Sequence, residues 1–340
     1  MLHQLESIPP ELLDSPATML HTFLPGPTLI HLPGRRTRPL FLSVLLHGNE
    51  YTGLQALQAL LIKYHNQELP RALSILVGNI KAARDGLRRL DSQPDYNRIW
   101  PGASKKMTDY PEAQMMHQIV DIMARREVFA SVDMHNNTGL NPHYACVNVL
   151  DHRFLQLATL FSRTVVYFIR PQGVQSMAFA KLCPATTLEC GKPGEHHGRD
   201  HALEYLEACL HLSAIPHHPV AEHDIDLFHT VAQVKVHDDI SFSFGRKGVD
   251  VVFNDDVDRL NFQELPGGTS LGMLNTDRAP LVAKDEHGIE VTDRYIDTQD
   301  NRLVLARPIM PSMLTLDERV IRQDCLCYFM ERFTPATIIA

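Results

Sequence analysis

Two residues that could bind a metal ion, His47 and Glu50, follow the apolar run at 44–46. A tight turn can bring an imidazole nitrogen and a carboxylate three residues apart to one ion, and Gly48 eases the backbone at that turn. Open α/β sheets bind their ligands at the carboxyl ends of the strands. We therefore interpret this corner as a candidate metal site. A chance His-x-x-Glu pair in a chain with 19 histidines is the alternative.

Two further strand ends carry polar residues of the same kind. His135 follows the apolar run at 128–134, and Asp133 within that run could orient a metal ligand through a hydrogen bond. Glu189 ends a third apolar run, Ala-Thr-Thr-Leu-Glu. A catalytic zinc usually takes three protein ligands and leaves one position open for water. Because a buried imidazole or carboxylate is costly without a partner, we expect these strand ends to form one site.

Short apolar runs alternate with longer segments of helical period as far as about residue 214. The runs predict strands near 39–46, 73–79, 129–134, 143–150, 164–169 and 185–189. The periodic segments predict helices near 52–65, 110–126, 152–162 and 198–213. This alternation predicts an α/β fold whose central sheet is mainly parallel or mixed, with helices on both faces.

The pattern changes after residue 218, which predicts a second domain. The segment at 215–223, Ile-Pro-His-His-Pro-Val-Ala-Glu-His, reads as a linker. Beyond it, short strands are divided by turn signals such as Pro-Gly-Gly and Asp-Glu-His-Gly. We therefore predict one domain over 1–218 and a smaller, mostly β domain over 223–340.

Composition and charge exclude several classes of partner. The net charge is −8, and the 32 lysines and arginines do not form the basic block that a nucleic acid or an anionic membrane requires. No stretch of about 18 apolar residues is present, and the N-terminus lacks a positive segment followed by a long apolar run. We therefore predict a cytoplasmic protein with no nucleic-acid or membrane partner. The six cysteines form no Cys-x-x-Cys pair and are interpreted as reduced core residues.

Four motifs together resemble a known family. They are His-Gly-Asn-Glu at 47–50, Asp-Tyr-Asn-Arg-Ile-Trp-Pro-Gly at 95–102, Asp-Met-His-Asn-Asn-Thr-Gly at 133–139 and Leu-Glu-Cys-Gly at 188–191. Their order and intervals resemble the zinc carboxypeptidase superfamily, specifically its succinylglutamate desuccinylase and aspartoacylase branch, over about residues 40–215. The resemblance implies a zinc hydrolase domain over 1–218. The β tail is consistent with the second domain of that branch.

The resemblance also implies a role for each strand-end residue. His47, Glu50 and His135 match the ligands of one zinc ion per chain, and Glu189 matches the general acid and base. Elementary chemistry agrees, because zinc polarises a carbonyl and lowers the pKa of water toward about 7. A carboxylate beside it can then move a proton from the water to a departing amine. The expected reaction is hydrolysis of an amide.

Substrate-binding roles follow from the same resemblance. Asn97 and Arg98 match a pair that binds a substrate carboxylate, a role that suits the planar two-pronged guanidinium. An arginine that polarises the scissile carbonyl matches Arg88, nine residues after Asn79. The neighbouring Arg89 stays open as the alternative for this role.

The combined features predict a deacylase of N-acyl amino acids or similar small carboxylates. A metallocarboxypeptidase acting on short peptides is the alternative, and a non-catalytic binding protein is disfavoured because every proposed catalytic residue type is present. Residues 171–188 lack the arginine that aspartoacylases place before the catalytic glutamate, which argues against N-acetylaspartate. His143 or Tyr144 could line the pocket, although a strand start is the favoured interpretation there, and Tyr295 is a candidate pocket residue from the C-terminal domain. The acyl group, the amine and homo-oligomerisation stay open.

Overall fold

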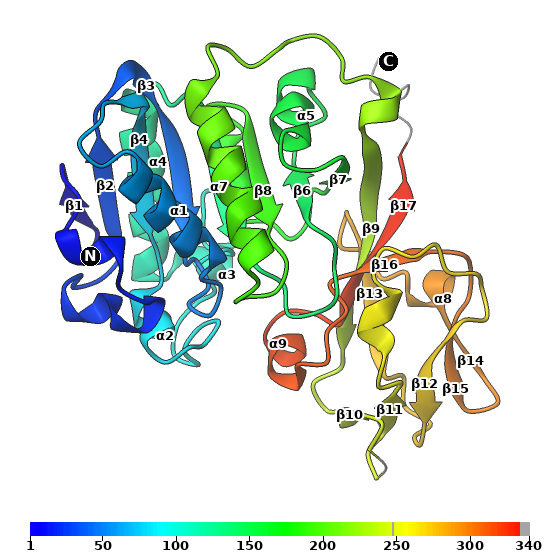
Figure 1. Cartoon of the computed structure of the whole chain (residues 1–340). Helices are drawn as coiled ribbons and strands as arrows, with labels where there is room; N and C mark the ends of the chain where they lie inside the picture. The colour runs from blue at the N-terminus through cyan, green and yellow to red at the C-terminus, as the bar shows by residue number, and fades with distance from the viewer. Residues whose placement is uncertain (247, 334–340) are drawn as a thin grey trace. The chain divides into compact units, whose positions relative to one another are not determined.

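The structure, a computed structural model, describes residues 1–246 and 248–333 (Figure 1). The chain divides into two compact units. Among the described residues, the first holds Met1–Asn136 and His143–Asp226, and the second holds Asn137–Pro142 and the residues from Leu227 to Phe333. Residues 334–340 of the predicted C-terminal domain lie outside the described residues. The predicted domain limits, 1–218 and 223–340, stay a prediction, because a division by contacts does not show where a segment folds by itself.

The first unit is built on one mixed sheet with strand order β1-β2-β4-β3-β5-β8-β6-β7. Its central strands β4, β3, β5 and β8 run parallel, whereas β2 is antiparallel to β4 and β6 is antiparallel to β8. The predicted mixed sheet is therefore confirmed. The strands are β1 (His3–Leu5), β2 (Thr28–Leu32), β3 (Gly34–Val44), β4 (Leu69–Val77), β5 (Ala130–His135), β6 (Tyr144–Val147), β7 (Thr164–Tyr167) and β8 (Ala185–Glu189).

The four predicted helices are present within a few residues of their expected limits. The helices of the first unit are α1 (Thr52–Lys63), α2 (Ile80–Arg84), α3 (Lys105–Thr108), α4 (Pro111–Arg125), α5 (His152–Thr159), α6 (Gln175–Phe179) and α7 (His196–His211). Sequence reasoning missed α2, α3 and α6, because four or five residues are too few to display a helical period. It also missed the edge strand β1 and its neighbour β2.

Helices cover both faces of this sheet. On one face α1 approaches so closely that a Cβ on Gly53 would lie 2.7 Å from the Cβ of Met134. On the other, Phe179 of α6 stacks on Phe41 of β3 with ring centroids 4.3 Å apart. In Figure 1, α1 and α7 lie in front of the strands and α4 lies behind them. Side chains alternate along a strand, so Asp133 and His135 point to the face opposite Met134.

The second unit is mostly β, as predicted. Strand β9 (Asp226–Val236) pairs with β13 (Leu281–Asp285) and β17 (Cys327–Arg332), and β17 pairs with β16 (Met310–Ser312). A separate sheet has the order β10 (Phe242–Phe244), β11 (Val251–Phe253), β12 (Ser270–Leu274), β15 (Arg302–Leu305) and β14 (Ile296–Gln299). Two short helices, α8 (Thr292–Tyr295) and α9 (Glu318–Gln323), accompany these strands.

Tyr295 belongs to the hydrophobic core of the second unit. It is 1% exposed, and its ring centroid lies 5.6 Å from that of Phe329. The interpretation of Tyr295 as a pocket residue was therefore wrong, because an aromatic residue within a polar segment can still point into the core. Tyr144, in contrast, is the first residue of β6, as expected.

Two further observations concern the predictions from composition. All six cysteines are buried thiols. Within the described residues, every helix is too short or too polar to cross a membrane.

Candidate metal centre and active site

His47, Glu50 and His135 converge at the carboxyl ends of β3 and β5. The Nδ1 atom of His47 lies 2.9 Å from Oε1 of Glu50, and Nδ1 of His135 lies 2.7 Å from Oε2 of Glu50. The two Nδ1 atoms are 3.2 Å apart. All three side chains are buried. The structure therefore brings together the three residues predicted to bind zinc.

The backbone after β3 turns sharply to present two of these residues. Leu45 adopts a φ of 57°, a left-handed conformation that is uncommon for a branched side chain and that clusters at functional sites. The Glu50 backbone amide then donates to the His47 carbonyl at 3.2 Å, closing the turn. Gly48 is required for close approach to α2, since a Cβ there would lie 2.2 Å from the Ala83 nitrogen.

The geometry of the three donors fits a zinc ion. Ligands about 2.0–2.1 Å from a tetrahedral zinc lie roughly 3.3 Å from one another, close to the observed separations. In each imidazole, the nitrogen that faces away from the three donors, Nε2, contacts a carboxylate. Nε2 of His47 lies 2.9 Å from Oδ1 of Asp95, and Nε2 of His135 lies 2.8 Å from Oδ2 of Asp133. Such contacts hold the proton on Nε2, which leaves the Nδ1 lone pair free for a metal.

The electrostatics of the cluster also favour a cation. Burial raises the pKa of Glu50, but His47 and His135 outweigh it and lower that pKa below the ordinary value. Burial lowers the pKa of His135, yet Asp133 and Glu50 together hold it well above the ordinary value. Without a metal the carboxylates therefore keep a proton on an imidazole. A metal ion can replace that proton.

Arg88 is part of the same buried network. Its Nη2 donates to Oδ2 of Asp95 at 3.0 Å, and its Nη1 lies 3.4 Å from Oε1 of Glu50. Arg89 instead donates to the carbonyls of Leu90 and Gln93. The structure thus places Arg88 beside the metal ligands and turns Arg89 elsewhere. Its predicted role at the scissile carbonyl stays a prediction.

Asn97 lies behind His135. Its Nδ2 is 3.0 Å from Nε2 of His135 and 3.3 Å from Oδ2 of Asp133, and its Oδ1 accepts the Gln175 amide at 2.9 Å. Arg98 is half-buried and donates to the Asn97 carbonyl at 2.8 Å. Because Nε2 of His135 carries the proton that faces Asp133, the Asn97 amide donates to the Asp133 carboxylate, and Asn97 supports His135 through Asp133. The substrate-binding role predicted for the pair stays a prediction.

Glu189 ends β8 directly beside a metal ligand. It is the register partner of His135 across a parallel ladder and of Tyr144 across an antiparallel one. Parallel neighbours lie about 4.8 Å apart and point to the same face, so the Glu189 carboxylate emerges next to the cluster. The residue is 7% exposed. Its predicted catalytic role stays a prediction.

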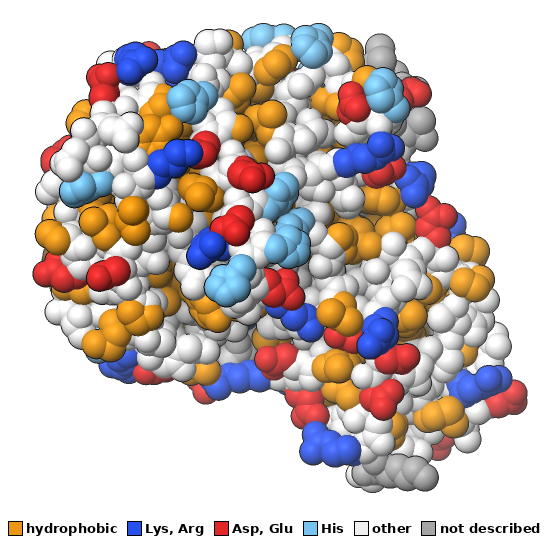
Figure 2. All heavy atoms as spheres, viewed as in Figure 1, with side chains coloured by type: hydrophobic (Ala, Val, Ile, Leu, Met, Phe, Trp, Pro, Cys, Tyr) orange, Lys and Arg blue, Asp and Glu red, His pale blue; other side chains and the backbone are white. Residues whose placement is uncertain are grey.

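A group of histidines lies close to this strand end. His143 stacks on His197 and His201, with ring centroids 4.6 and 5.4 Å away. A Cβ on Gly191, two residues after Glu189, would lie 2.8 Å from Nε2 of His143. Figure 2 shows a group of histidine side chains over α7, the helix that carries His197 and His201.

Sequence reasoning missed two supporting residues of the cluster. Asp95 is the first residue of the Asp-Tyr-Asn-Arg motif, so an acidic residue in that motif was the available signal. Asn136 donates its backbone amide to Oε2 of Glu50 at 3.2 Å and accepts the Thr52 amide at 3.1 Å. No sequence signal distinguishes that role from an ordinary turn asparagine.

Comparisons with known proteins give a consistent result. Residues 36–212, just over half of the chain, match the family described as succinylglutamate desuccinylase/aspartoacylase catalytic domain. A comparison with curated proteins gave no match.

Several solved structures share the fold. Succinylglutamate desuccinylase from Chromobacterium violaceum is 18% identical, with a TM-score of 0.56 over 88% of this chain and 86% of that one. The product-bound ectoine utilization protein EutE (DoeB) from Ruegeria pomeroyi is 13% identical, with a TM-score of 0.56 over 90% and 88%. Murine aminoacylase 3 is 14% identical, with a TM-score of 0.52 over 88% and 96%. The fold expected from the sequence motifs is therefore confirmed.

Proposed function

Because the chain belongs to the succinylglutamate desuccinylase/aspartoacylase catalytic-domain family, we propose that it is a zinc-dependent amidohydrolase of N-acyl amino acids or similar small carboxylates. One observation carries the proposal. Two imidazoles and a carboxylate converge within 3.2 Å of one another, and each imidazole is backed by a buried carboxylate. This arrangement is typical of a catalytic zinc site, which uses three protein ligands.

His47, Glu50 and His135 would hold one zinc ion per chain. The chemistry that zinc supplies in such a site is Lewis acidity, which polarises a carbonyl and lowers the pKa of water toward about 7. Asp95 and Asp133 fix the tautomer and the orientation of the two imidazoles.

Glu189 is proposed as the group that moves the proton. Its carboxylate takes a proton from the attacking water and delivers it to the departing amine, so one residue serves first as base and then as acid. Its place beside His135 in the ladder supports this role. Burial keeps the carboxylate away from bulk solvent, where it would exchange protons without effect.

Arg98 is proposed to bind the free carboxylate of the substrate through a two-pronged ion pair. Asn97 holds Arg98 through its carbonyl and supports His135 through the Asp133 carboxylate, to which its amide donates. Arg88, buried between Asp95 and Glu50, is proposed to polarise the scissile carbonyl.

A peptidase would use the same residues. None of the proteins named above is described as a peptidase, so we propose a deacylase.

The experiment is a substrate panel. Zinc-loaded protein is incubated with N-succinyl, N-acetyl and longer N-acyl amino acids, with their carboxyl-amidated forms and with dipeptides, while released amine is measured. We expect turnover of at least one N-acyl amino acid and poor turnover of its amidated form. Glu189→Gln serves as the control for contaminating activity. Turnover of dipeptides alone would indicate a peptidase, and amine release that persists undiminished in Glu189→Gln would contradict the proposed chemistry.

A further inference from the structure

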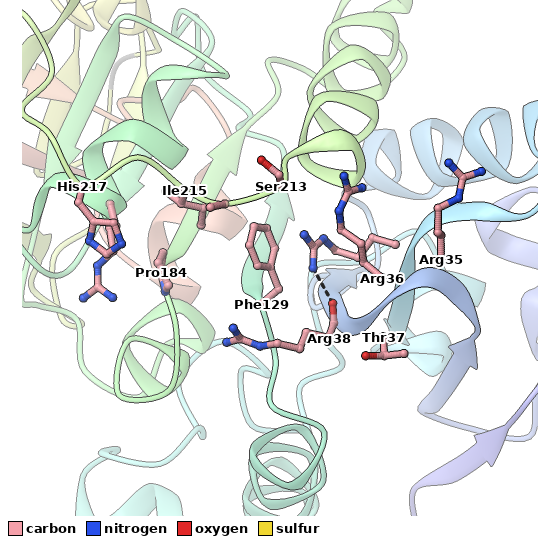
Figure 3. Close-up of a pocket in the computed structure, with 12 residues that line it drawn as sticks. Arg35, Arg36, Thr37, Arg38, Phe129, Pro184, Ser213, Ile215 and His217 are labelled. Carbon is pink, nitrogen blue, oxygen red and sulfur yellow. Dashed lines mark hydrogen bonds between the residues drawn. The ribbon is translucent and has the colours of Figure 1, made fainter.

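A strongly basic hollow lies at the amino-terminal edge of the sheet of the first unit. Its volume is about 470 Å³, and it is open to solvent. We call it the arginine hollow and define it by six of the residues that line it: Arg36, Arg38, Arg71, Phe129, Arg153 and His217. In Figure 3, Phe129 lies between Arg36 on one side and Ile215 and His217 on the other, and the side chain of Arg38 runs past Phe129 below it.

The arginine hollow is remote from the candidate metal centre. Phe129 directly precedes β5, and the metal ligand His135 is the last residue of that strand. Six residues of extended chain span roughly 20 Å. The two sites therefore lie at opposite ends of the same strands, and a ligand in the hollow does not touch the metal ligands.

An irregularity in the sheet gathers the arginines. Arg36 of β3 is the register partner of Arg71 of β4, and the next regular pair is Leu40 with Leu73. Between these two pairs β3 advances by four residues and β4 by only two. Strand β3 therefore carries two extra residues, and Arg38 lies in this irregular segment. Like charges opposite one another on neighbouring strands are destabilising. Bulges, in turn, are over-represented beside functional sites, where they re-aim side chains.

Arg71 is the buried member of the group, with 2% exposure. Its guanidinium lies 3.5 Å from the Phe129 ring centroid and donates to the carbonyls of Arg38 and Leu212 at 2.9 and 2.8 Å. Within the described residues, its buried Nε has no hydrogen-bond partner. Burial lowers the pKa of Arg71 to about 10, and the positive charges of Arg36 and Arg38 contribute to this decrease to a smaller extent. Within the described residues, the charge of Arg71 is therefore faced by neutral carbonyls and an aromatic ring.

Half-buried Arg36 and exposed Arg38 also lack compensating charge. Arg36 donates to the Pro70 carbonyl at 3.4 Å, and Arg38 donates to the Glu127 carbonyl at 3.0 Å. Among residues 1–246 and 248–333, neither these two nor Arg71 forms an ion pair with a carboxylate. Arg35 and Arg153, which also line the hollow, pair with Glu68 and Asp151. Three guanidinium groups thus converge with their positive charges unbalanced.

We propose that the arginine hollow binds a compact anion that carries two or more charges, such as a phosphate group or a small polycarboxylate. Guanidinium groups match the oxygens of both through paired hydrogen bonds. Phe129 is only 8% exposed, and Arg71 covers its ring, so an aromatic base has no surface on which to stack. The ligand is therefore small and polar. The inference is independent of the proposed catalytic function.

The test compares two probes on three proteins. Inorganic phosphate and tricarballylate are titrated into zinc-loaded wild type, the double variant Arg36→Gln/Arg38→Gln and the control Arg125→Gln. Arg125 is an exposed residue in the last turn of α4 and does not line the hollow. We expect at least one probe to bind wild type and the control within twofold of each other, and to bind the double variant at least tenfold more weakly. The stronger probe identifies phosphate or carboxylate as the recognised group.

Two further readouts keep the result interpretable. The thermal midpoint of the double variant without a probe should equal or exceed that of wild type, because repulsion on Arg71 is relieved. Hydrogen exchange should slow on probe binding at 34–38, 69–72 and 213–217 and stay unchanged at 47–50. Equal affinity of wild type and double variant, binding of neither probe, or protection confined to 47–50 would each overturn the proposal.

Discussion

Replacement of Asp133 by asparagine tests how the cluster holds a metal ion. Asp133 is fully buried, and its carboxylate accepts the Ser43 hydroxyl at 2.6 Å and lies 2.8 Å from Nε2 of His135. An asparagine has nearly the same shape, and its carbonyl can still accept the imidazole proton. The substitution therefore removes the negative charge while it preserves the tautomer of His135.

The magnitude follows from the role of the carboxylate. Loss of a hydrogen-bonding partner behind a metal-ligating histidine typically weakens metal affinity 10–100-fold. At 1.36 kcal/mol per factor of ten, this range corresponds to about 1.4–2.7 kcal/mol. We expect Asp133→Asn near the lower limit, because the hydrogen bond survives. Asp133→Ala should reach the upper limit, because it also leaves Nε2 of His135 and the Ser43 hydroxyl without their acceptor.

The assay is competition for zinc against a chromophoric chelator of known affinity, with the thermal midpoint of each variant measured in parallel. Asp121→Asn is the matched control, since Asp121 is exposed on α4 and its loss removes the same charge. Zinc affinities of Asp133→Asn and Asp133→Ala that both stay within twofold of wild type, in folded proteins, would refute the reasoning. So would an equal loss in Asp121→Asn.

Four other outcomes are expected. Glu189→Gln should keep its zinc while turnover falls by roughly 10²–10⁴, measured by metal content and steady-state kinetics; near-normal turnover would remove its proton-transfer role. Arg98→Lys should lose about 1.5–3 kcal/mol of transition-state stabilisation in kcat/KM, because a point charge cannot replace a two-pronged contact; an unchanged kcat/KM would contradict it. Purified wild type should contain about one zinc per chain, whereas His47→Ala and His135→Ala should contain little, and unchanged content by elemental analysis would reject the ligand set. Because Asp133 and Glu50 raise the pKa of His135, zinc binding at pH 7 should release about one proton and weaken as pH falls, measured by calorimetry in buffers of different ionisation enthalpy; binding without proton release would show that the imidazole is already neutral.

The ligand residues could be predicted from the sequence because each is attached to a strong local signal. Val44 to Leu46 and the run before His135 are apolar enough to be buried strands, and buried strands of an α/β sheet end at a common edge. Residues distant in sequence were therefore predicted to meet without any knowledge of contacts. The structure brings them within hydrogen-bonding distance.

Other features could not be predicted because no local signal encodes them. Asp95 reaches His47 from a loop that has no periodicity, and α2, against which Gly48 packs, is only five residues long. The arginine hollow was even less predictable from the sequence. Arg36 and Arg38 are neighbours in the sequence, but no sequence signal connects them with the distant Arg71. Only the register shift between β3 and β4 brings them together.

The period of two along a strand explains why one tripeptide supplies both a ligand and its support. In Asp133-Met134-His135 the outer residues point to one face of the sheet, where the carboxylate reaches Nε2 of the imidazole at 2.8 Å, and Met134 points to the other face, against Gly53 of α1. A shift of the strand by one residue would place the methionine at the metal centre and both polar residues under the helix. The register of β5 with β8 is therefore held from both sides, by close packing on one face and by the metal centre on the other. The same register places Glu189 opposite His135, so the packing of α1 on Met134 helps to position the proposed proton-transfer residue.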